Sequence, residues 1–235
     1  MSYEPDVHKV QISILRALLF APHAGFAKLQ KTTSLTSDHF TFHIKKLMDA
    51  GLVEKIDTKY SLTPRGKEYA NRMDTDENEM EKQPKVSVVL LAERHIGDRR
   101  EFLVQQRLKQ PYYGFYGRPG GKVRWGESFE TAAAREMKEE IGLDGTFTFS
   151  HIFHKSDFKK SDGTLLEDKV FLVMHCIDAS GEMIQEFEGG KNYWMTQDEL
   201  AAQDKVFESA LDFMKYLDEG ISYRAQDYVY DDTEY

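Results

Sequence analysis

Three glutamates near the middle of the chain have a spacing suited to binding a metal ion. Glu136, Glu139 and Glu140 lie in a run that we expect to be helical, from about Ser128 to Ile141. Residues at i, i+3 and i+4 share one side of a helix, so the three carboxylates should cluster. Carboxylates held this close repel one another and gain most when a hard divalent cation lies among them. The spacing therefore favours a site for Mg²⁺, with Mn²⁺ as the usual substitute.

Further residues at fixed offsets surround these glutamates. Gly121 begins the run and Leu143 ends it, with Glu127, Arg135 and Gly142 at fixed positions between them. A solvated surface helix would explain several glutamates, but not these residues at these offsets. The stretch resembles the Nudix box, G-x5-E-x7-R-E-U-x-E-E-x-G-U with U a bulky aliphatic residue, and every specified position is filled. By this resemblance the segment is identified as part of a Nudix hydrolase domain.

The resemblance implies a reaction and a role for each box residue. Nudix hydrolases cleave a nucleoside diphosphate linked to another moiety, and they give a nucleoside monophosphate and the phosphorylated moiety. Mg²⁺ or Mn²⁺ suits this reaction because such ions neutralise diphosphate charge and activate water. The implied roles are Glu136 and Glu140 as principal metal ligands, Glu139 as a ligand or water-activating base, Arg135 as the residue that orients the carboxylates, Glu127 as support for the loop–helix geometry, and the Gly120–Gly121 backbone close to the metal.

Residues outside the box are further candidates. Glu188, and after it Glu186, lie in a loop where some Nudix proteins place another metal ligand or a general base, although a solvated loop explains them equally well. Arg118 stands where the family usually has an apolar residue, so it is either an extra cation near the phosphates or a surface variation. Arg107 is a candidate for a phosphate or base contact, or a structural residue. Many ADP-ribose hydrolases of the family carry a proline past the box, and its absence after Pro119 argues against that substrate.

Periodic apolar residues predict the elements that position the box. In the box helix, Phe129, Ala133, Met137 and Ile141 recur every four residues as a core stripe, and Gly142 is placed to end the helix. Apolar runs predict strands at 85–92, 101–107, 146–153 and 169–177, and a closing helix at 198–217. With the family resemblance, residues 85–218 are expected to form a Nudix α/β/α sandwich with a mixed sheet. An acidic, tyrosine-rich tail follows at 219–235.

The first 73 residues form a separate pattern. It predicts helices at 7–20, 26–31 and 38–50, strands at 52–56 and 60–63, and a last helix opened by Pro64. This order resembles the winged helix-turn-helix domain of bacterial MarR-type regulators, so the fold class is α+β with two domains. In such domains the third helix enters the major groove of double-stranded DNA and the hairpin reaches a flanking groove. The DNA-facing residues implied are Ser37, His39, Thr41, His43, Lys45, Lys46 and Lys59.

Charge and composition leave the role of this first domain open. Residues 1–73 carry 11 Lys and Arg and 7 Asp and Glu, a net charge of +4 on a chain whose total is −9. A mildly basic first third fits nucleic-acid contact, an ordinary solvated surface, or a dimerisation or docking module. Residues 74–84 are acidic, nearly without apolar side chains, and end in proline, so they are expected to be an exposed linker.

Other bulk features narrow the class of protein. No apolar run approaches the roughly 18 residues of a membrane span. The start of the chain lacks the basic segment of a secretory signal. Cys176 is the single cysteine, so an internal disulfide is excluded and a buried thiol is expected. We therefore expect a cytoplasmic protein without membrane partners, and a homodimer is plausible because both module types commonly pair.

Two functional hypotheses follow. The first is a Mg²⁺-dependent hydrolase of a nucleoside diphosphate derivative that also binds DNA. The second is a transcriptional regulator whose Nudix domain senses a nucleotide metabolite such as a nucleotide-sugar. The complete box favours catalysis, because Nudix-related regulators often carry a damaged box and often have the two domains in the opposite order.

Overall fold

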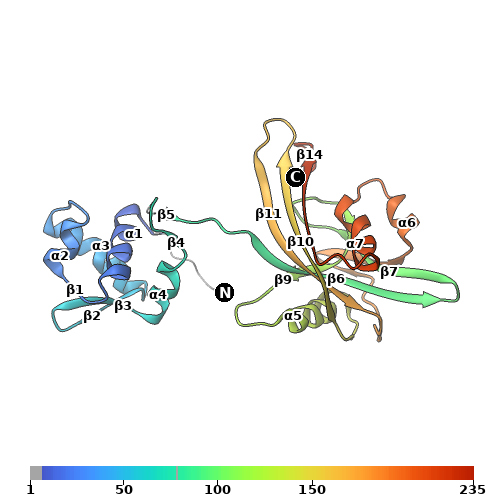
Figure 1. Cartoon of the computed structure of the whole chain (residues 1–235), viewed down its shortest axis with the longest axis horizontal. Helices are drawn as coiled ribbons and strands as arrows, with labels where there is room; N and C mark the ends of the chain where they lie inside the picture. The colour runs from blue at the N-terminus through green and yellow to red at the C-terminus, as the bar shows by residue number, and fades with distance from the viewer. Residues whose placement is uncertain (1–6, 78) are drawn as a thin grey trace. The chain divides into compact units, whose positions relative to one another are not determined.

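The chain divides into two compact units, Met1–Lys82 and Gln83–Tyr235, in the computed structural model (Figure 1). The structure describes residues 7–77 and 79–235. Residues 1–6 lie outside the described residues. They begin the predicted domain 1–73, and they form the start of the chain, where the basic segment of a secretory signal is lacking. Asn78 of the predicted linker also lies outside the described residues. Within the described residues, no helix is both long and apolar enough to cross a membrane.

The N-terminal unit packs helices on a small antiparallel sheet of order β1-β3-β2. Its elements are α1 (Lys9–Phe20), β1 (Ala24–Gly25), α2 (Phe26–Lys31), α3 (Ser37–Asp49), β2 (Val53–Ile56), β3 (Lys59–Leu62) and α4 (Pro64–Ala70). They lie within a few residues of the predicted helices and strands. The core gathers Ile14, Leu15, Phe40, Leu47 and Leu52, each almost fully buried.

Local chemistry sets the ends of these helices. The His8 ring accepts a hydrogen bond from the Val10 N–H, and Gln11 accepts one from the His8 N–H, which together cap α1. Thr63 caps α4 by accepting from the Gly66 N–H. Met48, near the end of α3, has an exposed side chain.

The predicted linker 74–84 is more ordered than its composition indicates. Met73–Asp74 (β4) pairs with Glu79–Met80 (β5), and the Arg16 side chain donates to the Thr75 carbonyl at 2.6 Å. Met73 is buried and Met80 packs against the same N-terminal core. The first part of the segment therefore folds back on the N-terminal unit, because two methionines gain from burial there.

A mixed sheet organises the C-terminal unit, as predicted. Its order is β12-β13-β7-β6-β11-β10-β14, with β8 beside β7 and β9 beside β6. The β6–β11 and β10–β14 pairs are parallel and the others antiparallel. The strands are β6 (Lys85–Ile96), β7 (Arg99–Arg107), β8 (Tyr116–Gly117), β9 (Gly120–Lys122), β10 (Thr148–Lys159), β11 (Leu165–Cys176), β12 (Glu186–Phe187), β13 (Gly190–Met195) and β14 (Tyr223–Tyr230).

Helices cover both faces of this sheet (Figure 1). On one face lies α5 (Phe129–Glu136), which continues into the π-helical turn η1 (Met137–Ile141). The other face is covered by α7 (Glu208–Asp218), while the short α6 (Gln197–Ala201) lies near β7 and β13. Strand β6 alternates between the layers, so Val88 packs with the α5 side and Val89 with the α7 side. The result is an α/β/α arrangement.

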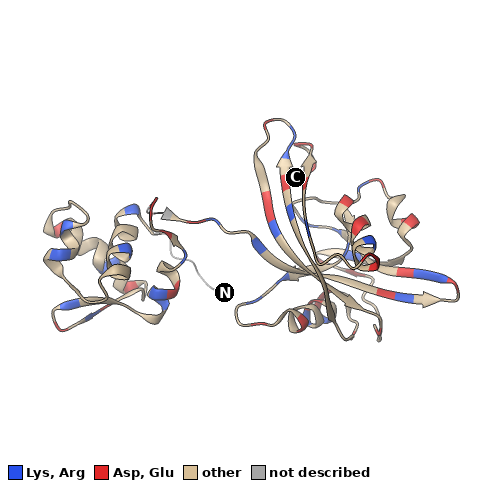
Figure 2. Cartoon of the chain, in the orientation of Figure 1, with Lys and Arg blue, Asp and Glu red and all other residues tan. Residues whose placement is uncertain are grey.

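Strand β6 serves both halves of the sheet. Its first part, through Ala92, pairs with β11, whereas Glu93–Ile96 pairs with β7. The far end of the β6–β7 hairpin carries both signs of charge (Figure 2), and cross-strand pairs join Arg94 to Glu101 and Arg100 to Glu93, both at 2.6 Å. By changing partners, β6 places residues of β7, β9 and β11 around a common space.

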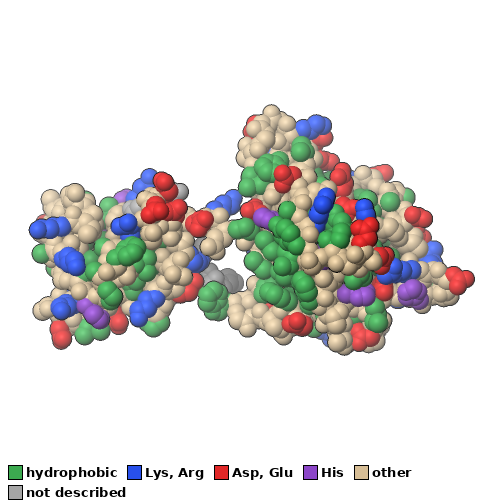
Figure 3. Space-filling view, in the orientation of Figure 1, with side chains coloured by type: hydrophobic (Ala, Val, Ile, Leu, Met, Phe, Trp, Pro, Cys, Tyr) green, Lys and Arg blue, Asp and Glu red, His purple; other side chains and the backbone are tan. Residues whose placement is uncertain are grey.

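Burial on helix α5 and on the sheet face beneath it differs from the sequence-based expectation. Phe129, predicted in the core stripe of the box helix, is 39 % exposed, and Ala132 is buried beside Ala133 instead. Val86 also remains 43 % exposed, which shows that helix α5 covers only part of its sheet face. Figure 3 shows apolar side chains gathered on one part of the visible surface of this unit, over β6, β10 and β11.

Two further elements differ from the predictions. The helix predicted at 198–217 is broken into α6 and α7, because the segment between them bonds to the backbone of Tyr116. The Tyr116 N–H donates to the Lys205 carbonyl, and the Tyr116 carbonyl accepts from the Phe207 N–H. The tail 219–235 contains strand β14, which pairs in parallel with β10 and buries Tyr228 and Tyr230. Burial of the tyrosine rings stabilises this strand. The composition of the tail did not reveal that Tyr228 and Tyr230 would both face the core.

Gly66 provides a test of the N-terminal packing. A Cβ at this position would lie 1.8 Å from the Leu52 carbonyl oxygen, a backbone atom that cannot swing aside. We expect Gly66→Ala to destabilise the unit by about 2 kcal/mol or more, measured as lost amide-exchange protection in α1 and α4 of the full chain. Lys67→Ala, at an exposed neighbour on the same helix, is the control and should change protection little. Equal protection in both variants would contradict the packing.

Candidate active site

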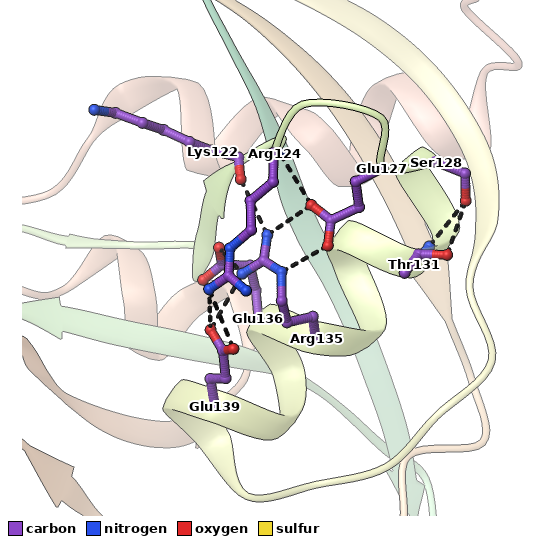
Figure 4. A network of polar contacts seen from close by, with 8 residues as sticks. All are labelled: Lys122, Arg124, Glu127, Ser128, Thr131, Arg135, Glu136 and Glu139. Atoms are coloured by element: carbon purple, nitrogen blue, oxygen red, sulfur yellow. Dashed lines mark hydrogen bonds and ion pairs between the residues drawn. The ribbon is translucent and has the colours of Figure 1, made fainter. Parts of the chain in front are cut away.

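The box motif, residues 121–143, folds as a strand, a loop and a helix (Figure 4). Strand β9 pairs with β6, with Gly121 opposite Val88, and the loop then leads to Ser128, whose hydroxyl accepts from the Thr131 N–H and caps α5. The turn η1 closes at Gly142, whose φ of 82° is left-handed and suits a glycine C-cap. These elements present the box side chains from the loop and from one side of the helix.

Arg135 is the centre of the polar network drawn in Figure 4. Its guanidinium donates to both carboxylate oxygens of Glu127, at 2.6 and 2.9 Å, and to Glu136 at 2.6 Å. It also donates to Glu139 at 3.2 Å and to the Lys122 carbonyl at 3.1 Å. The side chain is only 13 % exposed. One planar donor therefore ties the loop to the helix and aligns the carboxylates.

The ionisation of this network follows from its geometry. Hydrogen bonds from Arg135 lower the pKa of Glu127 to about 2, and the Arg124 N–H supports the same shift. In return, the hydrogen bonds to Glu127 raise the pKa of Arg135 above its ordinary value. The pair therefore stays charged at any pH near neutral.

Gly121 is required by the position of Glu136. A Cβ on this glycine would lie 2.0–2.4 Å from the carboxyl atoms of Glu136. No larger residue fits unless that carboxylate moves. The glycine of the motif thus lets one carboxylate lie directly against the β9 backbone.

The three glutamates do not converge as the sequence predicts. Glu139 is held at 3.0 Å by Arg124 as well as by Arg135, whereas Glu140 accepts from Gln105 at 3.1 Å and lies 3.7 Å from Lys109. Among the described residues there is no group of three or more His, Cys, Asp or Glu side chains close enough to hold a metal. One Arg135 nitrogen thus binds both Glu136 and Glu139, whereas Glu140 has Gln105 and Lys109 as partners.

Glu140 belongs to a network that the sequence did not reveal. Gln105 also donates to Asn192, and the fully buried Asn192 side chain donates to the carbonyls of Glu140 and Ile184, both at 2.9 Å. Burial raises the pKa of Glu140, against the effects of Gln105 and Lys109. Only the pairing of β7 with β13 brings Gln105 and Asn192 together, and no local motif marks either residue.

Glu136, Glu140 and Gly121 line a cavity of about 740 Å³, a size usual for small-ligand sites. Arg107 and Arg118 line it too. Arg107 donates to the Gln110 and Pro111 carbonyls at 3.1 and 2.5 Å. The Arg118 guanidinium lies over the Phe102 ring and donates to Gln197 at 2.8 Å, and burial lowers the pKa of Arg118 to about 9. Arg118 is therefore not a surface variation.

Donor chemistry at this cavity fits a hard divalent cation. The Glu136 and Glu140 side chains and the Gly120–Gly121 backbone all border the same space and offer oxygen atoms. Oxygen ligands are those that Mg²⁺ and Mn²⁺ prefer. Glu139 would join such a site only if it left Arg124 and Arg135.

The structure does not bring the loop glutamates into this group. Glu188 is exposed in the turn between β12 and β13 and is absent from the described residues that line the cavity. Glu186 pairs with Lys191 at 3.1 Å. In the N-terminal unit, six of the seven residues predicted to face DNA are exposed: Ser37, His39, Thr41, Lys45, Lys46 and Lys59. The exception is His43, which is half-buried and stacks on His8 with 5.0 Å between ring centroids.

The Arg135–Glu127 pair makes stability depend on pH. Because the folded pKa of Glu127 lies near 2, its ionised form stabilises the fold above about pH 4.5, and this contribution is lost as the pH falls towards 2. Glu127→Gln should lower stability at pH 7 and flatten the loss between pH 4.5 and 2, measured by urea unfolding at several pH values. Glu182→Gln, at an exposed glutamate, should keep the wild-type slope. The pair has no such role if both variants show that slope.

Comparisons with known proteins agree with this architecture. A family model described as the NUDIX domain matches residues 81–217. An 8-oxo-dGTP diphosphatase from Proteus vulgaris is 47% identical over 45 residues, which make up 19% of this chain and 40% of that protein. The match thus spans less than half the length of the curated relative.

Solved structures resemble the C-terminal unit. A mutator MutT protein from Bacillus halodurans has a TM-score of 0.51 at 20% identity, over 64% of this chain and 93% of its own, and it shows the shared fold. A MutT NUDIX hydrolase from Burkholderia pseudomallei is 25% identical with a TM-score of 0.46, over 60% and 100% of the two chains. Because the NUDIX domain match covers more than half of the 235 residues and contains the whole Arg135-centred loop and helix, the chain belongs to the NUDIX family.

Proposed function

We propose that the protein is a Mg²⁺- or Mn²⁺-dependent pyrophosphohydrolase acting on a nucleoside diphosphate derivative. The supporting observation is that one cavity presents two carboxylates, Glu136 and Glu140, beside the cations Arg107, Arg118 and Lys109. Carboxylates suit a divalent ion, and arginine and lysine suit the phosphate oxygens. This combination is the one that breaking a P–O–P linkage needs.

In this mechanism Glu136 and Glu140 would hold the cation, which when bound would supply neutralisation of diphosphate charge and a water of lowered pKa. Arg118 would bind phosphate oxygens of the linkage. Glu139, once it has left Arg124 and Arg135, would take a proton from the attacking water. The water oxygen then forms a new bond to phosphorus, the P–O–P bond breaks, and a nucleoside monophosphate and a phosphorylated product leave. Arg135 keeps Glu136 aligned throughout.

The substrate panel follows from the charge of the cavity and from the curated relative. The Proteus vulgaris protein is named for 8-oxo-dGTP, so nucleoside triphosphates belong in the panel with nucleotide-sugars and dinucleotides. Glu188, exposed beside the β12–β13 turn, remains a candidate base or ligand that would have to move to reach the cavity.

Removing a cavity carboxylate should abolish turnover. We expect Glu140→Gln to lower kcat by about 100-fold or more, because metal-assisted charge stabilisation is worth several kcal/mol, and EDTA to do the same. The measurement is chromatography of products from the panel with Mg²⁺ or Mn²⁺. Glu182→Gln is the matched control and should retain activity. The proposal fails if the wild-type protein releases nothing from any compound with either metal.

We also propose that the N-terminal unit is a winged helix-turn-helix domain that binds double-stranded DNA. Its order of α1, α2, α3, the β2–β3 hairpin and α4 supports this, with α3 as the recognition helix and the hairpin as the wing. Thr41, Lys45 and Lys46 are exposed along α3, and Lys59 lies at the start of β3. His43 would act by supporting α3 against His8 instead of contacting DNA.

Salt dependence distinguishes phosphate contacts from incidental basic residues. We expect the double variant Lys45→Gln, Lys46→Gln to bind a duplex from the upstream region of its own coding sequence more weakly, and to reduce the slope of log K against log [salt] by about 2. Lys67→Gln, on α4, should leave both unchanged. An equal effect of Lys67→Gln, or no binding at low salt, would refute the assignment.

The regulator hypothesis is compatible with both proposals. A nucleotide metabolite that binds the DNA-bound and DNA-free forms differently would couple the two sites. Under this alternative, the same metabolite changes DNA affinity in the Glu140→Gln variant, in which cleavage is lost.

A further inference from the structure

The cavity has a second, basic end that the proposed reaction does not use. Beyond the carboxylates it is lined by Lys85 of β6, Lys155 of β10 and Lys169 of β11, with Arg107 of β7. Glu167 is the acidic residue among its lining at this end. Charges of both signs lie along β10 and β11 (Figure 2). The balance between them decides what this end can bind.

Lys155 is already neutralised within the protein. Its ammonium group donates to Asp157 and, at 3.0 Å, to the Tyr230 hydroxyl of β14. Tyr112 donates to the second oxygen of Asp157 at 2.8 Å. The Lys155 and Asp157 side chains are 4 % and 0 % exposed, and burial lowers the pKa of Lys155 to about 8. This lysine is a buried support for the cavity wall.

Lys169 has a weaker partner. Its ammonium group lies 3.6 Å from the Glu167 oxygen that Lys85 already occupies at 2.5 Å, and it lies over the Tyr112 ring at 5.6 Å. The other oxygen of Glu167 accepts from Tyr235 at 2.9 Å. One carboxylate thus serves two lysines, and the Lys169 side chain keeps 21 % of its surface exposed, at the cavity.

Arg107 adds a further positive charge. Its hydrogen bonds go to the carbonyls of Gln110 and Pro111, and among the described residues no carboxylate lies within 4.0 Å of it. Asp157 and Glu167 therefore stand against Lys85, Lys155 and Lys169, which leaves one positive charge in excess. Arg107 adds a second positive charge, which Glu140 and Glu167 both influence. Burial lowers the pKa of Lys169, and Lys85 and Arg107 add to this effect.

Like charges at a half-buried site repel more strongly than in water, because the dielectric is lower there. An anionic group bound between Lys169 and Arg107 would relieve this repulsion and accept charge-assisted hydrogen bonds from both. Arg107 would give up no carboxylate partner to do so, and Lys169 would give up only the 3.6 Å contact with Glu167 that it shares with Lys85.

We infer that Lys169 and Arg107 form a subsite for an anionic group, phosphate or carboxylate, on the moiety attached to the nucleoside diphosphate. This inference rests on the proposed function and narrows its substrate class. The acidic end then holds the linkage to be cleaved, while the basic end selects a substrate whose second half is itself charged.

Matched substrate pairs test this inference. UDP-glucuronic acid and UDP-glucose differ by a carboxylate, and NADP⁺ and NAD⁺ differ by a phosphate. Calorimetric binding and kcat/KM are measured for both pairs on the full chain. The wild type should prefer the anionic member of at least one pair, and Lys169→Gln should reduce that preference by about tenfold, the value of one charge-assisted hydrogen bond.

Matched variants separate charge recognition from general damage. Lys169→Arg should retain the preference, and so should Lys160→Gln, which removes an exposed lysine paired with Asp231 at 3.0 Å outside the cavity. Restriction of the preference to one pair identifies the anion as carboxylate or phosphate. If binding shows the preference but no compound is cleaved, the subsite stands and the proposed reaction falls. The subsite is refuted if the wild type binds both members of each pair equally, or if Lys169→Gln weakens both alike.

Discussion

The fork of hydrogen bonds from Arg135 is the constraint on which the rest of the site depends. It fixes the loop through Glu127, aligns Glu136 and donates a longer hydrogen bond to Glu139. Glu136 in turn can lie against β9 only because Gly121 has no side chain. The residues at the fixed offsets of the motif therefore depend on one another, sterically at Gly121 and electrostatically at Arg135. Loss of one of them would leave the contacts of its neighbours unmade. This explains why the arginine, which lines no part of the described cavity, is as necessary to the proposed chemistry as the carboxylates.

The cavity depends on the division of β6 between two partners. Because β6 pairs first with β11 and then with β7, residues from β7, β9 and β11 surround one space. Its two ends differ in charge, with Glu136 and Glu140 at one and Lys85 and Lys169 at the other. Arg107 is influenced by Glu140 and by Glu167, which places it between the ends. A single cavity with opposite charges at its ends favours an elongated substrate that carries anionic groups along its length.

Strand β14 gives the C-terminal segment a role in this cavity. Tyr230 supports Lys155, and Tyr235 supports Glu167, so the segment after α7 stabilises the wall that carries the basic end. The N-terminal unit has its own core and its own surface lysines. The proposed hydrolysis and the proposed DNA binding therefore depend on different residues.

The sequence by itself determined the elements that depend on local periodicity and on a complete motif. Helices α1, α2 and α3, the strands β6, β7, β10 and β11 of the mixed sheet and the cap at Gly142 all follow from residues close together in the chain. Only the tertiary structure decided which distant residues meet. It gave Arg124 to Glu139 and Gln105 and Asn192 to Glu140, broke the last helix at Tyr116, and paired β14 with β10. Contacts between strands depend on pairing register, and register is set by packing across the whole sheet, which no short stretch of sequence contains.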